Sequence, residues 1–131
     1  MKTAIAILLV VAGVIHLLPV AGVIGPEKLA ALYGIAIDNP NLAILMRHRA
    51  VLFGLLGAFL CWAAWRPDLQ PIALGAGAVS AGSFLWLAWK TGGYNALLER
   101  VVVADIVAMA CLALAAVLYA CARLPAAATN Q

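Results

Sequence analysis

Long apolar segments alternate with short polar connections along the chain. Each apolar segment is close to the roughly 20 residues that a helix needs to cross the hydrocarbon core of a membrane. None of the connections between them is long enough to form a soluble domain. The pattern predicts one domain over residues 1–131 with an all-α fold, an integral membrane four-helix bundle. The four predicted spans are residues 3–24, 41–65, 71–89 and 96–121.

The connection between the first two spans carries helix signals of its own. A glycine and a proline at residues 25–26 end the first span and start a short helix at residues 26–33, which Gly34 closes. Its apolar side chains fall on one side, so we expect this short helix to lie at the membrane interface. Asn39 and Pro40 then supply a cap and a first-turn proline for the second span.

The composition agrees with a membrane protein and argues against several partners. Hydrophobic residues make up 67% of the chain and charged residues 10%, against roughly 45–50% and about 25% in soluble domains. The net charge of +3 is small and scattered, so we expect membrane lipid but no nucleic acid as a partner. The first apolar run is longer than the core of a signal peptide, about 7–15 residues, so we expect it to remain a helix.

Polar residues interrupt all four predicted spans near one membrane face. Counted at about 1.5 Å per residue, they lie roughly 9–14 Å below that face. Ionisable residues within a membrane span usually face the interior of the bundle and mark a site. The candidate ligand-binding residues at or near this level are His16, Arg47, His48, Arg49, Ser83, Arg100 and Asp105.

The neighbours of each arginine predict its direction. Arg47 shares a helix stripe with Gly54, Gly57 and other small residues, and membrane helices place small residues against one another. We therefore expect Arg47 to face inward, with Asp105 on the fourth span as its counter-ion. Arg49 is about 200° further around the helix, on a face with large apolar residues, where it would reach the surface or pack against a neighbouring helix.

Three functional hypotheses follow from this polar layer. The first is binding of an amphiphilic anionic ligand of lipid head group, isoprenoid or quinone type, with Arg47 as anchor, His16 or His48 as hydrogen-bond partner and Asp105 as counter-ion. The second is a structural or subunit protein whose buried charges only hold helices together. The third is a small proton-coupled transporter, because intramembrane His and Asp residues relay protons.

The sequence does not assign a reaction. No nucleophile with an adjacent base can be identified, so whether the protein is an enzyme stays open. Cys61, Cys111 and Cys121 lack the Cys-x-x-Cys spacing of thiol redox enzymes, and we expect them to be packing residues. A haem held by His16 and His48 is a minor alternative, and we expect no metal site.

Small residues on the third span leave the oligomeric state open. Gly75, Gly77 and Gly82, together with neighbouring alanines, provide a surface for close helix packing. We expect this surface to pack within the bundle, although a homodimer would use the same type of surface.

Four segments carry a resemblance to a known family: GVIHLLP at residues 13–19, LYG at 32–34, DNPNL at 38–42 and MRHRAVLFG at 46–54. The chain resembles a family of small, largely uncharacterised four-span proteobacterial proteins that lie near the DoxX-like proteins. Some members carry the label phosphopantetheine adenylyltransferase, a soluble α/β enzyme whose His-x-Gly-His type motif this chain lacks. The resemblance implies a multi-pass protein of the bacterial inner (cytoplasmic) membrane and brings no established activity.

Overall fold

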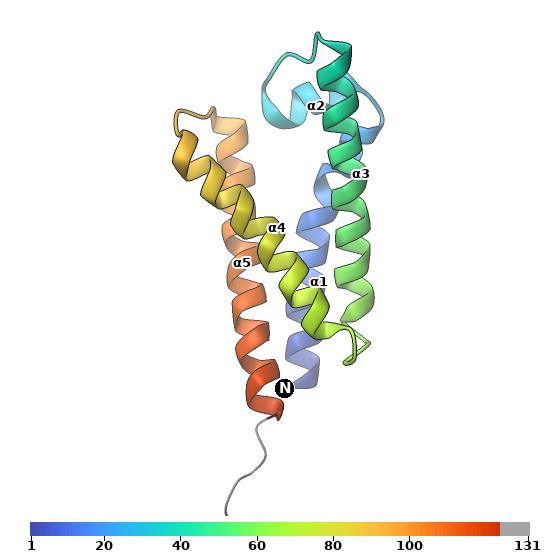
Figure 1. Cartoon of the computed structure of the whole chain (residues 1–131), viewed down its shortest axis with the longest axis vertical. Coiled ribbons are helices and arrows are strands. Elements are labelled where there is room, and N and C mark those ends of the chain that lie inside the picture. Colours follow the sequence, from blue (N-terminus) through green and yellow to red (C-terminus); the bar gives the residue numbers. More distant parts are fainter. Residues whose placement is uncertain (124–131) are drawn as a thin grey trace, which may run out of the picture.

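The structure is a computed structural model that describes residues 1–123, and this part of the chain is helical without strands (Figure 1). Its first helix changes from α-helix to 3-10 helix at Leu18, ahead of Pro19, a residue that has no backbone N–H to donate. The elements are α1 (Lys2–Leu17), η1 (Leu18–Val23), α2 (Pro26–Tyr33), α3 (Pro40–Ala63), α4 (Gln70–Thr91) and α5 (Ala96–Arg123).

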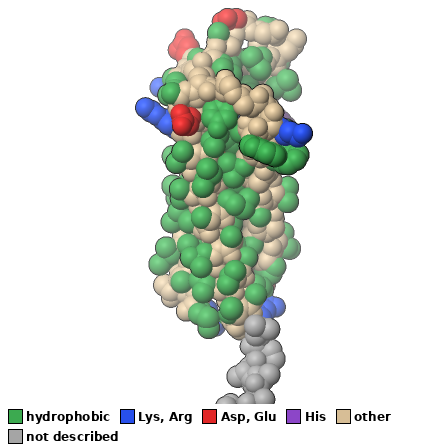
Figure 2. Space-filling model, turned by 90° about the vertical axis from the view of Figure 1, so that its left-hand side faces the viewer, with side chains coloured by type: hydrophobic (Ala, Val, Ile, Leu, Met, Phe, Trp, Pro, Cys, Tyr) green, Lys and Arg blue, Asp and Glu red, His purple; other side chains and the backbone are tan. Residues whose placement is uncertain are grey.

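Four helical segments are long and apolar enough to cross a membrane, which confirms the predicted bundle. They are Lys2–Val23, Pro40–Ala63, Gln70–Thr91 and Ala96–Arg123. Figure 2 shows one face of the molecule, where hydrophobic side chains cover the length of the bundle and charged side chains lie near its two ends. The protein is therefore a multi-pass membrane protein.

The helices run up and down the bundle, with Met1 at the same end as the end of α5 (Figure 1). Helix α1 packs against both α3 and α5, and α4 packs chiefly against α5. Helix α4 crosses the bundle obliquely, so that it starts beside the end of α3 and then diverges from it (Figure 1).

Helices α1 and α3 cross closely at two glycines. A Cβ atom added to Gly57 would lie 2.7 Å from the carbonyl oxygen of Gly13, and one added to Gly13 would lie 2.6 Å from Sγ of Cys61. Small residues of this kind let the backbones of two membrane helices approach closely. Close packing matters here because there is little hydrophobic driving force between helices in lipid. The small-residue stripe of α3 thus faces α1.

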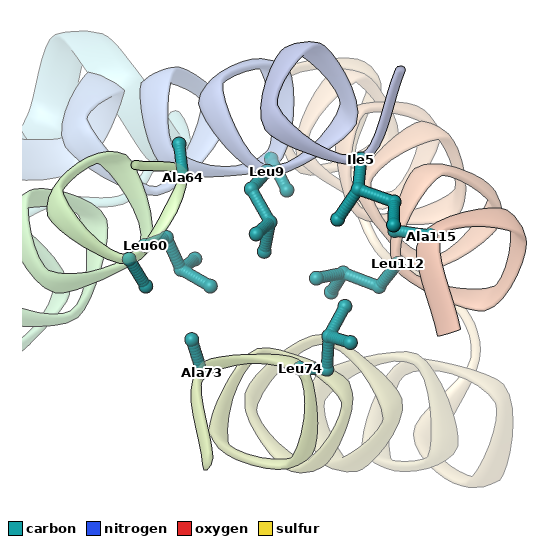
Figure 3. Packing of buried hydrophobic residues seen from close by; sticks show 10 residues of the cluster. Ile5, Leu9, Leu60, Ala64, Ala73, Leu74, Leu112 and Ala115 are labelled. Atoms are coloured by element: carbon teal, nitrogen blue, oxygen red, sulfur yellow. The ribbon is translucent and has the colours of Figure 1, made fainter. Parts of the chain in front are cut away.

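The half of the bundle that holds Met1 and the end of α5 has a core built from apolar side chains. We call it the apolar half. Its side chains come from α1, α3, α4 and α5 and point toward one another (Figure 3). The buried members of this core are Ile5, Leu9, Ala12, Leu60, Ala63, Ala64, Ala73, Leu74, Leu112 and Ala115.

Helix α2 folds back over the other half of the bundle. Pro26 occupies its first turn and Gly34 ends it in the left-handed region, at φ +66°, as the sequence predicted. Leu29 and Tyr33 are its buried residues and lie one turn apart. The Asn95 side chain donates hydrogen bonds from Nδ2 to the carbonyl oxygens of Tyr33, at 2.9 Å, and Gly34, at 3.2 Å, which ties the end of α2 to the start of α5.

Candidate functional site

A cavity of about 270 Å³ lies between α1, η1, α2, α3 and α5, and we call it the polar cavity. Its polar lining consists of residues from four helices, three of which cross the membrane. These residues are His16, Tyr33, Arg49, Arg100 and Asp105. The rest of the wall is apolar and includes Leu18, Pro19, Phe53, Leu97 and Val101. A cavity with mostly apolar walls and a few convergent polar groups is typical of ligand sites.

His16 is held in one tautomer by its own helix. The side chain is 1% exposed, and its Nδ1 atom lies 2.8 Å from the carbonyl oxygen of Ala12. Because a carbonyl oxygen only accepts, Nδ1 carries the proton in this contact and Nε2 of the neutral ring is left as an acceptor. Nε2 is buried and has no hydrogen-bond partner within residues 1–123, so it is available to a ligand in the cavity.

Arg49 is surrounded by aromatic rings and not by acceptors. Its guanidinium carbon lies 4.9 Å from the ring centre of Phe53 and 5.6 Å from those of Tyr33 and Phe84. These distances are typical of cation–π contacts, which stabilise the charge without using the N–H donors. Within the described part of the chain the half-buried guanidinium forms no hydrogen bond or ion pair, and its donors remain unused.

Asp105 is the buried carboxylate of the same cavity. It is 6% exposed and lies on α5, beside Ala104. His16 and Arg49 line the same cavity. No residue among 1–123 forms a hydrogen bond or an ion pair with it, and a buried carboxylate without partners is costly. Its two oxygens are therefore further groups that a ligand or water can satisfy.

Tyr33 closes the cavity from the side of α2. Burial raises the pKa of its phenol above the ordinary 10.0, with Arg49 acting to lower it and Asp105 to raise it. The hydroxyl therefore stays protonated at neutral pH and can donate a hydrogen bond. Sequence reasoning missed Tyr33, Phe53 and Phe84 as parts of the site. The available signal was that Arg49 and Phe53 are four residues apart, on one face of a helix.

The predicted inward direction of Arg47 is wrong, whereas Arg49 packs against neighbouring helices, one of the two outcomes predicted for it. Arg47 is exposed, and its Nε donates a hydrogen bond of 3.0 Å to the carbonyl oxygen of Val23 in η1. The predicted ion pair between Arg47 and Asp105 is accordingly not formed. The physical reason is that the small-residue face of α3 packs against α1 and η1, whereas the cavity lies on another face, which carries Arg49.

The remaining predicted residues are divided between the cavity and the surface. Arg100 is exposed and lines the cavity from α5. His48 and Ser83 are exposed and do not line it, and the hydroxyl of Ser83 donates to the carbonyl oxygen of Ser80 at 3.0 Å. A haem held by both histidines would require His16 and His48 to face one cavity. They do not, because only His16 lines the polar cavity. Residues 1–123 also contain no group of three or more His, Cys, Asp or Glu side chains suited to a metal ion.

A larger groove, of about 430 Å³, lies at the opposite end of the bundle. Its polar residues include Lys2 and Arg123, which are exposed, and Gln70, whose Nε2 donates to the carbonyl oxygen of Ala64 at 3.3 Å. The hydroxyl of Tyr119 is buried there without a partner among the described residues. This groove has no buried ionisable pair, so the polar cavity is the stronger candidate for a functional site.

Fold and cavity together define a class of protein: a multi-pass helical membrane protein whose bundle encloses polar groups that have no partner among residues 1–123. No family model, curated protein or solved structure matches the chain. The resemblance to DoxX-like proteins therefore stays a prediction of the sequence.

Proposed function

We propose that this membrane protein binds an amphiphilic anionic ligand, of lipid head group, isoprenoid or quinone type, with its polar head group in the polar cavity. The observation that carries the proposal is Arg49, a half-buried guanidinium with no acceptor within residues 1–123. A guanidinium offers five N–H donors in a planar fork that matches carboxylate and phosphate oxygens. An anionic head group is the partner that this arrangement lacks.

The other polar residues receive complementary roles in this proposal. Nε2 of His16 accepts a hydrogen bond from a hydroxyl or other donor of the head group, and Tyr33 donates one. Asp105 orients Arg49 through its charge, and Arg100 adds a second positive charge at the exposed side of the cavity. Two arginines against one aspartate leave an excess of positive charge, which favours an anion.

The arrangement of the charges argues against a purely structural role. Charges that fasten helices to one another are expected to touch, because direct hydrogen bonds offset part of the cost of removing them from water. Asp105 and Arg49 form no such contact within residues 1–123, where the salt bridge present is the exposed pair Arg66 and Asp68, 3.1 Å apart. The implied location, the bacterial inner membrane, rests on the family resemblance alone.

Native mass spectrometry with hexadecyl phosphate as the probe tests this proposal. We expect a saturable one-to-one adduct on the wild-type protein, a loss of affinity of about 10- to 100-fold in Arg49→Met, and no change in Arg47→Met. The range corresponds to a charge-assisted hydrogen bond worth about 1.5–3 kcal/mol. Arg47 is the matched control because it has the same chemistry two residues away and lies outside the cavity.

A second probe separates head-group recognition from partition into lipid or detergent. Hexadecyltrimethylammonium has the same chain and the opposite charge, and we expect no saturable adduct with it. Equal binding of both probes would contradict the proposal. An equal loss of affinity for hexadecyl phosphate in Arg49→Met and Arg47→Met would contradict it as well.

A further inference from the structure

A second cavity adjoins the polar cavity on the side where α4 diverges from α3 (Figure 1). It measures about 390 Å³, and we call it the lateral cavity. Its wall is predominantly apolar and comes from α2, α3, α4, α5 and the segments that connect them. Its apolar lining includes Met46, Phe84, Leu87 and Leu98.

The two cavities share part of their walls. Tyr33 and Arg49 line both, and they come from α2 and α3. Arg49 therefore stands at the junction, where its guanidinium contacts Phe53 from the polar cavity and Phe84 from the lateral cavity. Cation–π contacts are worth about 0.5–2 kcal/mol each, less than the charge-assisted hydrogen bonds that an anion would offer.

We propose that the lateral cavity holds the apolar chain of the ligand while the head group lies in the polar cavity, an inference that rests on the proposed function. On binding, the Arg49 guanidinium turns from Phe84 toward the anion, and the two cavities join behind it. The chain then lies between α3 and α4 against Met46, Phe84 and Leu87, and reaches the surrounding lipid where these helices diverge. The ligand class is thus an anion with one long apolar chain that enters from the side of the bundle.

Two features of the lateral cavity favour a chain over a second polar molecule. Its lining from α3 and α4 is apolar at Met46, Phe84, Leu87 and Ala88, with Thr91 at the end of α4, and Leu87 is exposed. The charged group that lines it is Arg49, and in this proposal Arg49 binds the head group and not the chain. An apolar chain needs no hydrogen bonds from such a wall and is supplied by the membrane itself.

Photo-crosslinking with hexadecyl phosphate that carries a diazirine near the end of its chain tests the inference. We expect labelled peptides that contain Met46, the segment from Phe84 to Leu87, or Leu98. Leu87→Trp, which fills the edge of the lateral cavity, is expected to reduce this labelling at least fivefold. Leu55→Trp is the matched control, because Leu55 has a similar exposed fraction, 64% against 61% for Leu87, and lines none of the described cavities.

The outcomes separate this inference from the proposed function. Labelling confined to Leu18 and Leu97, on the other side of the polar cavity, together with an Arg49-dependent adduct, would overturn the inference and leave the proposed function standing. Labelling and adduct formation that are both indifferent to Arg49→Met would overturn the two together. Labelling in the lateral cavity that depends on Arg49 and is blocked by Leu87→Trp supports both.

Discussion

The two halves of the bundle are packed by different chemistry, although the spanning helices α1, α3, α4 and α5 run through both. In the apolar half, side chains such as Leu9, Leu60 and Leu112 point toward one another and form a core without charged groups (Figure 3). In the other half, His16 and Asp105 are also buried, but Nε2 of His16 and the carboxylate of Asp105 have no hydrogen-bond partner within residues 1–123. The apolar half therefore stabilises the fold, whereas the buried polar groups of the other half cost free energy unless a ligand or water satisfies them.

The largest expected change is a loss of stability caused by a substitution in the apolar half. Leu112 is 2% exposed and packs against α4 at Gly77, so Leu112→Ala removes contacts and leaves a cavity. We expect a loss of about 2–5 kcal/mol in the free energy of unfolding, measured by denaturant titration in detergent with tryptophan fluorescence. A loss below about 1 kcal/mol would show that this core is not what stabilises the bundle.

A smaller effect, confined to binding, is expected from His16. His16→Phe keeps an aromatic ring beside Phe53, whose ring centre lies 5.8 Å from that of His16, but removes Nε2. We expect the affinity for hexadecyl phosphate to fall roughly 2- to 10-fold, the range of one neutral hydrogen bond, with unfolding nearly unchanged. His48→Phe, on the exposed face of α3, should leave the affinity unaltered, and equal losses in both variants would remove the distinction between the two histidines.

The smallest effect is expected in the loop between α3 and α4. Hydrogen bonds from Arg66 lower the pKa of Asp68 below its ordinary 3.8. A carboxyl with a lowered pKa in the folded state stabilises the fold above its unfolded-state pKa, and this contribution disappears as the pH falls through the lowered value. Because the pair is exposed, Asp68→Asn should leave the melting temperature at pH 7 unchanged within error. A clear drop would mean that this loop matters more to stability than its exposure indicates.

The spans and the short helix could be predicted because their signals are local. Long apolar runs placed the spans to within about two residues, and Pro26 and Gly34 fixed the ends of α2. The direction of Arg47 could not be predicted in the same way. A stripe of small residues identifies the face that packs closely against another helix, here α1, but not the face that borders a cavity.

The aromatic surroundings of Arg49 depend on tertiary structure. Tyr33 reaches the site because α2 folds back and is tied to α5 through Asn95, a contact between residues 62 positions apart in the sequence. Phe84 contacts Arg49 from α4. The sequence pattern does not predict the oblique path of α4 that brings Phe84 there. Depth alone placed His16 and Asp105 together correctly, but it also included His48 and Ser83, because depth carries no information on direction around a helix.

One double variant tests most directly whether the polar half is a site or a set of helix fasteners. Arg49→Met with Asp105→Leu replaces both charges by apolar side chains of similar size, and both properties can be measured on one preparation. We expect a protein that unfolds at the same or a higher denaturant concentration than the wild type and forms no hexadecyl phosphate adduct. A protein that is destabilised by several kcal/mol while it keeps the adduct would contradict the account, because the charges would then hold the helices and not a ligand.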